Sequence, residues 1–247
     1  MRPNKYLLSR LILIACGSFS PPTAMHFRMF EIARNHFMER MMYEVIGGIV
    51  SPVHDGQQKS GLAAGRHRLA MLRLALRSSS WIRLSDWELR QPQWTPTVDV
   101  LKYHKDCINN ILTIKAERKQ NIVLPEWLPP ELLESANEVQ LRFLVGADLL
   151  ETFAKPELWT TEEIQNIVCN YGLVVLTRFG SDVDRYIFES DILSKYRGNI
   201  ELVINWTTNN LSSTLVRRLL KRGQSVKYLI DDDVIEYIRK HKLYDCK

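Results

Sequence analysis

A glycine-containing loop followed by a histidine carries the clearest chemical signal near the start of this 247-residue sequence. The run GSFSPPTAMH, residues 17–26, follows a short apolar run and opens a helical pattern. Its first backbone N–H groups can approach an anion, and the positive end of the helix dipole favours phosphate at the same place. Thr23 and His26 lie one helical turn apart and direct a hydroxyl and an imidazole to one side. We therefore expect a phosphate-binding loop, although it matches neither a dinucleotide fingerprint nor a P-loop.

A second polar cluster, LSSTLVR, occupies residues 211–217 near the other end of the chain. Ser212, Ser213 and Thr214 can cap a helix while their hydroxyl and N–H groups bind phosphate oxygens. Arg217 follows one turn later, and its planar guanidinium can bind two oxygens at once. For both clusters the structural alternative is an ordinary helix cap, with His26 capping its helix and the arginine in solvent.

Six short aliphatic or β-branched runs predict the strands that must position these clusters. They are residues 11–15, 43–50, 81–85, 141–145, 173–177 and 200–204. Helical patterns fall between most of them, including an apolar stripe at Phe30, Ala33 and Phe37. Strands that alternate with helices favour an α/β fold, a doubly wound, Rossmann-like parallel sheet with right-handed crossovers. Such a sheet binds ligands outside the carboxyl ends of its strands, where the loop of residues 17–26 begins.

The chain reads as a single domain, residues 1–247, with two parts that depart from the alternation. Residues 117–140 contain Pro125, Pro129 and Pro130 among many polar residues and predict a surface insertion or linker. Residues 209–247 predict a small C-terminal helical cap, with helices near residues 211–220 and 231–241. The run Asp231–Asp233 reads as an acidic helix start that faces the dipole rather than as a metal site.

Composition limits the class of partner and of compartment. The chain has 33 Lys plus Arg and 28 Asp plus Glu, a net charge of +5, which suits an anionic partner without requiring one. The four cysteines form no CxxC pair, which argues against a zinc site or a disulfide framework and favours a reducing compartment. Residues 11–16 are too short for a bilayer span of roughly 18 residues and precede no cleavage site. We expect a cytoplasmic or nuclear protein, not a secreted one, with no membrane span.

The two polar clusters and three longer stretches resemble one enzyme family. GxFxPxTxxH, complete at its five fixed positions, resembles the first motif of the nucleotidyltransferase superfamily, and residues 211–217 resemble its ISSTxxR motif with leucine for isoleucine. The stretches GGIVSPVHDGQQKSGLAAGRHRLAM, LRFLVGADLLETFAKPELW and SSTLVRRLLKRGQSVKYLI resemble the eukaryotic nicotinamide mononucleotide adenylyltransferases. The resemblance covers nearly the whole chain and is weakest over residues 117–140.

The resemblance implies a reaction and a set of residues for it. The 5′-phosphate of nicotinamide mononucleotide, or of its nicotinic acid form, would attack the α-phosphorus of ATP and give NAD, or deamido-NAD, and pyrophosphate. His26, Lys59 and Arg217 would be catalytic, Asp148 would bind ribose hydroxyls, and Mg²⁺ would come with ATP rather than in a protein cage. The nucleotide-binding set implied is Gly17, Ser18, Phe19, Thr23, Gly146, Asp148, Asn209, Ser212, Ser213 and Thr214. The mononucleotide-binding set implied is Trp94, Thr97, Leu158 and Trp159, whose tryptophans suit a cationic ring.

Several alternatives stay open at this point. Another enzyme of the superfamily, such as a cytidylyltransferase or pantetheine-phosphate adenylyltransferase, is disfavoured by the tryptophans and by GADLLETF. Class I aminoacyl-tRNA synthetases are remote because no KMSKS-like run occurs. A nucleic-acid role would rest on the basic residues 217–222, which lack interleaved aromatics, so no nucleic-acid partner is expected. A chaperone role toward protein clients, a homo-oligomer and the preference between the two mononucleotides are not decided by the sequence.

Overall fold

One parallel sheet forms the centre of the protein, as a computed structural model shows for residues 8–57, 61–117, 122–134, 137–178, 180–207 and 210–246. The six strands run in the order β3-β2-β1-β4-β5-β6, and all five neighbouring pairs are parallel. They are β1 Ser9–Gly17, β2 Tyr43–Pro52, β3 Ile82–Leu84, β4 Val139–Gly146, β5 Leu173–Leu176 and β6 Ile200–Val203. Each strand overlaps one predicted run, so the doubly wound parallel sheet is confirmed.

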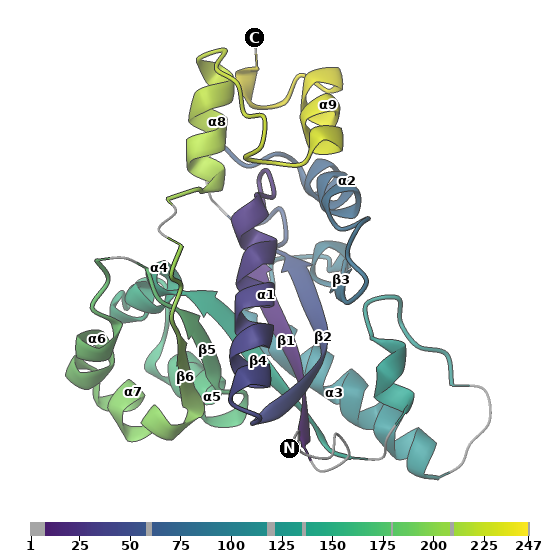
Figure 1. The fold of residues 1–247 in the computed structure, drawn as a ribbon, viewed down its shortest axis with the longest axis vertical. Coiled ribbons are helices and arrows are strands. Elements are labelled where there is room, and N and C mark those ends of the chain that lie inside the picture. The colour runs from purple at the N-terminus through teal and green to yellow at the C-terminus, as the bar shows by residue number, and fades with distance from the viewer. Residues whose placement is uncertain are drawn as a thin grey trace.

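Helices cover both faces of this sheet (Figure 1). They are α1 Ala24–Glu39, α2 Gly65–Ala75, α3 Thr97–Ala116, α4 Ala147–Leu150, α5 Thr161–Asn170, α6 Val183–Glu189, α7 Asp191–Lys195, α8 Ser213–Lys221 and α9 Asp232–Lys240. The sequence pattern did not predict α4, α6 and α7, because helices of one or two turns are too short to show an apolar period.

The side chains of β1 explain why its sequence is apolar without alternation. Leu11, Leu13 and Ala15 belong to the core shared with α1 and α2, whereas Ile12 and Ile14 belong to the core shared with α3 and α5. A strand that is buried on both faces needs an apolar residue at every position. β1 is therefore the central strand, and the loop that follows its carboxyl end starts from a strand that two cores hold in place.

The strand order changes direction between β1 and β4. β1 connects toward β2 on one side, and the later strands continue from β4 on the other side. β1 ends at Gly17 and β4 ends at Gly146, and the two strands are neighbours in register. In open parallel sheets this switch point leaves a crevice for ligands outside the strand ends.

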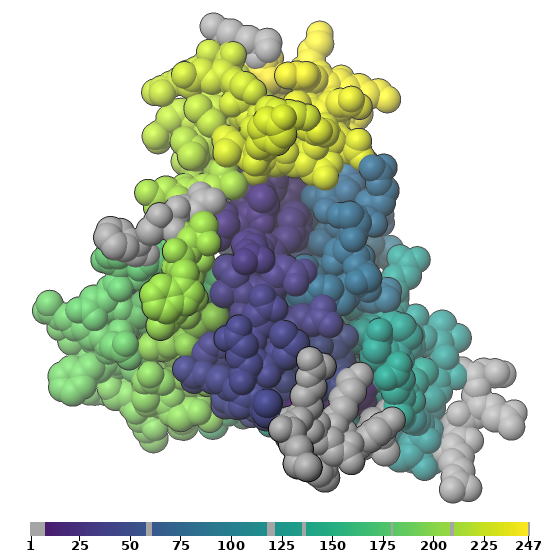
Figure 2. Space-filling view, in the orientation of Figure 1, coloured from purple at the N-terminus to yellow at the C-terminus, as the bar shows by residue number. Residues whose placement is uncertain are grey.

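The C-terminal helices form a separate small core at one end of the molecule. Val216 and Leu220 of α8 pack with Val234 and Ile238 of α9, and Met71 of α2 joins them. Figures 1 and 2 show this part at the top, above α2 and the start of α1. The Asp231 side chain accepts the N–H of Asp233 at 2.9 Å and caps α9, as expected of an acidic helix start.

Residues 117–140 do not form a surface segment throughout. Trp127 is 6% exposed, Leu128 is 2% exposed and Leu132 is completely buried. The ring of Trp127 meets the imidazole of His104 at 4.6 Å, and a short 3₁₀ helix, Pro130–Leu133, leads toward β4. The prolines shape turns against the core here, so the expectation of an exposed insertion does not hold for the residues that the structure describes between 122 and 134.

Two other sequence-based expectations concern membrane-spanning helices and the cysteines. Among the described residues, no helix combines the length and the apolar character needed to cross a bilayer. All four cysteines are described, and each is a free thiol.

Thr160→Ala should lower the free energy of unfolding by about 1 kcal/mol, measured by urea denaturation. Thr160 Oγ1 accepts the Glu163 N–H at 3.1 Å, and Glu163 Oε2 accepts the Thr160 N–H at 2.8 Å, which forms a reciprocal cap on α5. The neighbouring Thr161→Ala is the control and should change stability by less than about 0.5 kcal/mol. Equal stabilities of the two variants would contradict a capping role.

Candidate active site

A cavity of about 270 Å³ lies at the switch point of the sheet. Its walls come from the ends of β1, β4 and β5, from the start of α1 and from the cap of α8. Seven of the residues predicted from the sequence line it: Gly17, Ser18, Phe19, His26, Gly146, Asp148 and Ser212. The fold therefore brings the loop after β1 and the polar cluster before α8 to one place.

His26 presents one edge of its ring to the start of its own helix. Its Nδ1 accepts the backbone N–H of Thr23 at 2.8 Å, and the Thr23 hydroxyl lies 3.0 Å from the same nitrogen. The Phe19 ring meets the imidazole edge to face at 5.1 Å. Because a backbone N–H can only donate, Nδ1 must be unprotonated, and the proton of the neutral ring sits on Nε2.

Electrostatics keep this imidazole neutral. Burial lowers the pKa of His26 to about 4; Asp148 opposes that shift, and Arg178 adds to it. At neutral pH the ring is therefore an uncharged hydrogen-bond donor through Nε2. His26 combines the two roles that the sequence set against each other, because Nδ1 caps the helix while the ring lines the cavity.

Thr23 is a buried residue that serves His26. It is 1% exposed, and both its N–H and its hydroxyl are directed at the imidazole. These contacts indicate that Thr23 orients the ring, and a direct contact of Thr23 with phosphate stays a prediction.

The two polar clusters are joined by hydrogen bonds between residues almost two hundred positions apart. Arg217 Nη1 donates to the Ser20 carbonyl at 2.7 Å, and the Ser213 hydroxyl donates to the Pro21 carbonyl at 2.8 Å. Ser212 caps α8 by accepting the Leu215 N–H at 3.2 Å. The hydroxyls of Ser212 and Ser213 are thus engaged within the protein.

Arg217 is bound to the loop and is not one of the described residues that line the cavity with His26. Its Nη2 also lies 3.3 Å from the Thr214 hydroxyl. Arg217 therefore holds the loop and Thr214 contacts Arg217, and a direct contact of either with phosphate stays a prediction. Lys59 and Asn209 lie outside the described residues.

Gly146 and Asp148 occupy the opposite wall. A Cβ at Gly146 would lie 2.7 Å from Asp148 Oδ1, so only glycine permits this approach of the carboxylate. The Asp148 side chain is 65% exposed and lies 3.7 Å from Arg178 Nη1. Arg178, which also lines the cavity, was missed from the sequence, although it directly follows the strand run 173–177 and the strand-end rule could have found it.

The residues predicted for the mononucleotide differ in their exposure. Trp94 and Leu158 are exposed, and Thr97 is the first residue of α3. Trp159 is half-buried, donates from Nε1 to the Thr152 hydroxyl at 2.9 Å and meets the Phe153 ring at 4.9 Å. None of these four is among the described residues that line the His26 cavity, so their role stays a prediction.

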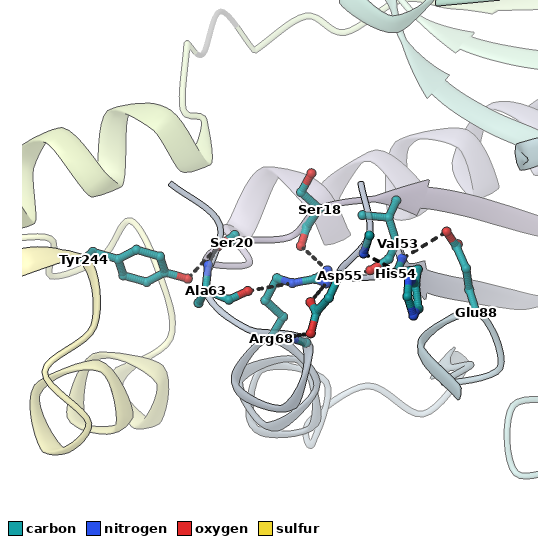
Figure 3. A network of polar contacts seen from close by, with 11 residues as sticks. Ser18, Ser20, Val53, His54, Asp55, Ala63, Arg68, Glu88 and Tyr244 are labelled. Atoms are coloured by element: carbon teal, nitrogen blue, oxygen red, sulfur yellow. Dashed lines mark hydrogen bonds and ion pairs between the residues drawn. The ribbon is translucent and has the colours of Figure 1, made fainter. Parts of the chain in front are cut away.

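A buried polar network beside the loop was also missed from the sequence (Figure 3). Arg68 is completely buried in α2, where a basic residue takes a core position next to Met71 and Leu72. Glu88 is 2% exposed and accepts the His54 N–H at 3.2 Å and the Ser51 hydroxyl at 3.4 Å. Burial raises the pKa of Glu88 to about 7 despite these bonds. An arginine on an apolar helix stripe was the available signal.

Comparison with known proteins defines the class and then the family. Residues 14–219 match the family model described as cytidylyltransferase-like, in agreement with the fold and the two motifs. The chain is 42% identical to the nicotinamide/nicotinic acid mononucleotide adenylyltransferase 1 of Bos taurus, over 97% of this chain and 90% of that protein. It therefore belongs to the family of nicotinamide/nicotinic acid mononucleotide adenylyltransferases.

Two further comparisons extend this result. The chain is 54% identical, over 99% of its length, to a nicotinamide-nucleotide adenylyltransferase of Drosophila melanogaster, of which it spans 64%. A solved structure of the Plasmodium falciparum nicotinic acid mononucleotide adenylyltransferase complexed with NaAD superposes with a TM-score of 0.65 at 22% identity, over 96% of this chain and 98% of that one. At that identity the superposition shows the fold.

The imidazole of His26 should not titrate between pH 8 and 5.5, because its folded pKa is about 4. In the ¹⁵N spectrum of histidine-labelled protein, the His26 signals, assigned by comparison with His26→Asn, should show the neutral Nε2–H tautomer throughout. Titration near pH 6.5 would contradict the geometry described above.

Glu88→Gln should stabilise the protein increasingly as the pH rises. The folded pKa of Glu88, about 7, lies above its usual value, so between those values the folded state holds a proton that the unfolded state has lost. Stability from this group therefore falls as the pH rises toward 7. Urea denaturation at pH 5, 6, 7 and 8 should show the gap between the variant and the wild type growing with pH; a constant gap would refute the assignment.

Proposed function

We propose that this protein transfers the AMP moiety of ATP to nicotinamide mononucleotide or nicotinic acid mononucleotide, giving NAD or deamido-NAD and pyrophosphate. The observation that carries the proposal is the joining of the two motifs around the His26 cavity by the Arg217–Ser20 and Ser213–Pro21 hydrogen bonds. The names of the relatives at 54% and 42% identity support the same activity.

The chemistry needs positive potential rather than a base. An oxygen of the mononucleotide 5′-phosphate forms the new bond to the α-phosphorus of ATP, and the bond from that phosphorus to the bridging oxygen of pyrophosphate breaks. The attacking phosphate is already ionised at neutral pH, since its second pKa is about 6. A neutral His26 that donates from Nε2 suits this reaction, because it stabilises charge on the α-phosphate without removing a proton.

Mg²⁺ would be held mainly by ATP. Within the part of the chain that the structure describes, no group of three His, Cys, Asp or Glu side chains could hold a metal ion. Mg²⁺ commonly keeps several waters and binds through the phosphate oxygens of a substrate, so it does not need a cage of protein side chains. When bound, the ion neutralises charge on the triphosphate, while His26 and the Gly17–Phe19 backbone orient it.

The other roles in the proposal follow from the family. Asp148, exposed at the end of β4, would accept hydrogen bonds from the adenosine ribose, and Arg178 beside it would contribute positive charge to the cavity. Trp94, Thr97, Leu158 and Trp159 would bind the mononucleotide. A cytoplasmic or nuclear location and a homo-oligomer stay expectations. The relatives named above are adenylyltransferases, and they lend no support to a chaperone role toward protein clients.

Incubation with ATP, Mg²⁺ and either mononucleotide tests the activity directly. We expect NAD or deamido-NAD and pyrophosphate in equal amounts, separated and quantified by chromatography. Parallel reactions with CTP, and with phosphopantetheine in place of the mononucleotide, are the controls for other branches of the superfamily. Product in those reactions alone would overturn the proposed substrate.

His26→Ala should lower kcat by about 100-fold or more, the usual consequence of removing one donor that stabilises developing charge. Circular dichroism should show an unchanged fold. The exposed His241 provides a matched control, and His241→Ala should keep wild-type kcat. Comparable kcat values for the two variants would remove His26 from the reaction.

A further inference from the structure

Arg68 is a cation placed where it cannot touch a ligand. Its side chain is completely buried, and it is not one of the described residues that line the His26 cavity. Its nitrogens instead donate to three backbone carbonyls: Nε to Ala63 at 3.0 Å, Nη1 to Ser18 at 3.1 Å and Nη2 to Val53 at 2.7 Å. Nη2 also meets Asp55 Oδ1 at 2.8 Å. Figure 3 shows Arg68 at the centre of these contacts.

The three carbonyls belong to different segments that surround the cavity end of the sheet. Ser18 follows β1, Val53 follows β2, and Ala63 precedes α2. The Ala63 N–H also donates to the Ser20 hydroxyl at 3.0 Å, which ties the segment before α2 to the loop after β1. One planar guanidinium with five N–H donors can hold three such segments in fixed directions, which a single ammonium cannot do.

The bond to Ser18 fixes the direction of an N–H group in the phosphate loop. In a trans peptide the C=O of one residue and the N–H of the next point in opposite directions. The one cis peptide among the described residues joins Ser20 to Pro21, so the Ser18–Phe19 peptide is trans. Because the Ser18 carbonyl points at Arg68, the Phe19 N–H points away from it.

The preceding peptide is turned in the same way. The Gly17 carbonyl accepts the Val53 N–H at 3.0 Å, so the Ser18 N–H points away from the segment after β2. Arg68 holds the carbonyl of Val53 as well, and thereby secures the partner of Gly17. Ser18 and Phe19 both line the cavity. Two successive N–H groups, those of Ser18 and Phe19, thus point away from the segment after β2 and from Arg68, respectively, at residues that line the cavity.

We propose that Arg68 is a positioning residue for adenylyl transfer, which holds the Ser18–Phe19 peptide so that its N–H is aimed at the phosphates of ATP. This inference rests on the proposed function. Arg68 acts through the loop and does not contact the substrate itself.

Asp55 supports this arrangement from the other side of the guanidinium. Its Oδ2 accepts the Gly65 N–H at 2.8 Å, so the carboxylate joins Arg68 to the first residue of α2. Desolvation raises the pKa of Asp55, but the hydrogen bonds from Arg68 and Gly65 outweigh it and leave the pKa below its usual value. Asp55 is therefore ionised at neutral pH and keeps the guanidinium plane in place.

Arg68→Lys tests the proposal with the charge retained. We expect kcat/KM for ATP to fall roughly 10- to 100-fold, because a misdirected N–H no longer stabilises the α-phosphate. The KM for the mononucleotide should change less than about twofold, because the variant leaves the binding of that substrate intact. A purely structural role would reduce the fraction of folded protein but leave both constants, expressed per folded molecule, at wild-type values.

Two further variants make the result decisive. Arg66→Lys, on an exposed position of the same helix, is the matched control and should behave as wild type. Asp55→Asn removes the charge that orients Arg68 and should reduce kcat/KM for ATP in the same direction by a smaller factor. If Arg68→Lys does not fold, Asp55→Asn decides, and wild-type kinetics in that variant would overturn the inference.

Binding of inorganic tripolyphosphate, measured by calorimetry, provides a readout independent of turnover. It should weaken in Arg68→Lys and not in Arg66→Lys. A wild-type protein that makes neither NAD nor deamido-NAD would refute the proposed function. An active wild type with unchanged ATP kinetics and unchanged tripolyphosphate binding in Arg68→Lys would refute the positioning role alone.

Discussion

The site depends on the withdrawal of carbonyl oxygens from the loop that faces the cavity. The carbonyls of Gly17, Ser18, Ser20 and Pro21 are bound, respectively, by the Val53 N–H, Arg68, Arg217 and the Ser213 hydroxyl. A carbonyl oxygen that faced the cavity would repel phosphate, whereas the peptides after Gly17 and Ser18 are turned to offer the N–H groups of Ser18 and Phe19. The peptides after Ser20 and Pro21 lead into prolines, which have no N–H, so the bonds at those two carbonyls fix the path of the loop. Four donors from three different segments thus hold a short loop, and two of them, the Val53 N–H and Arg68, turn its N–H groups outward.

The topology of the sheet makes this convergence possible. β1 is central and is packed on both faces, so the loop that follows it has a fixed starting point. β2 delivers Val53 on one side, and β4 delivers Gly146 and Asp148 on the other. The C-terminal helices have a core of their own, but the Arg217 and Ser213 bonds tie them to the loop. Residues from both ends of the chain therefore complete one cavity.

Patterns along the sequence predicted the helices and strands, which depend on local signals, and missed the contacts that depend on where side chains point. The six strands, the capped helix α5 and the two C-terminal helices follow from apolar runs and capping residues, which are local signals. The two motifs could be placed together because their strands and loops lie at one edge. The pattern did not show that Thr23 serves His26, that Arg217 binds a carbonyl, or that Trp127 is buried. Those outcomes depend on where side chains meet after folding.

Arg68 shows why sequence patterns did not reveal the other residues of the site. On a helical stripe an arginine reads as a residue at the boundary of the core, and nothing in its neighbours indicates three carbonyl partners. Arg178 was less hidden, since it directly follows a predicted strand. The difference is physical: a strand end has a fixed place in a parallel sheet, whereas a buried donor has no place until its acceptors have been assembled around it.

The two arginines that hold the loop are bound to the protein itself. Arg68 and Arg217 are bound to carbonyls of the loop, while the cavity is lined by a neutral imidazole, by Ser18 and Phe19 of the loop, and by the pair of Asp148 and Arg178. A transferring phosphoryl group gains charge on its oxygens as pyrophosphate leaves, and fixed donors that need no reorganisation stabilise that charge most effectively. Because Asp55 offsets the charge of Arg68, Arg68 contributes mainly by fixing the direction of the Ser18–Phe19 peptide, whose N–H then needs no reorganisation during the transfer.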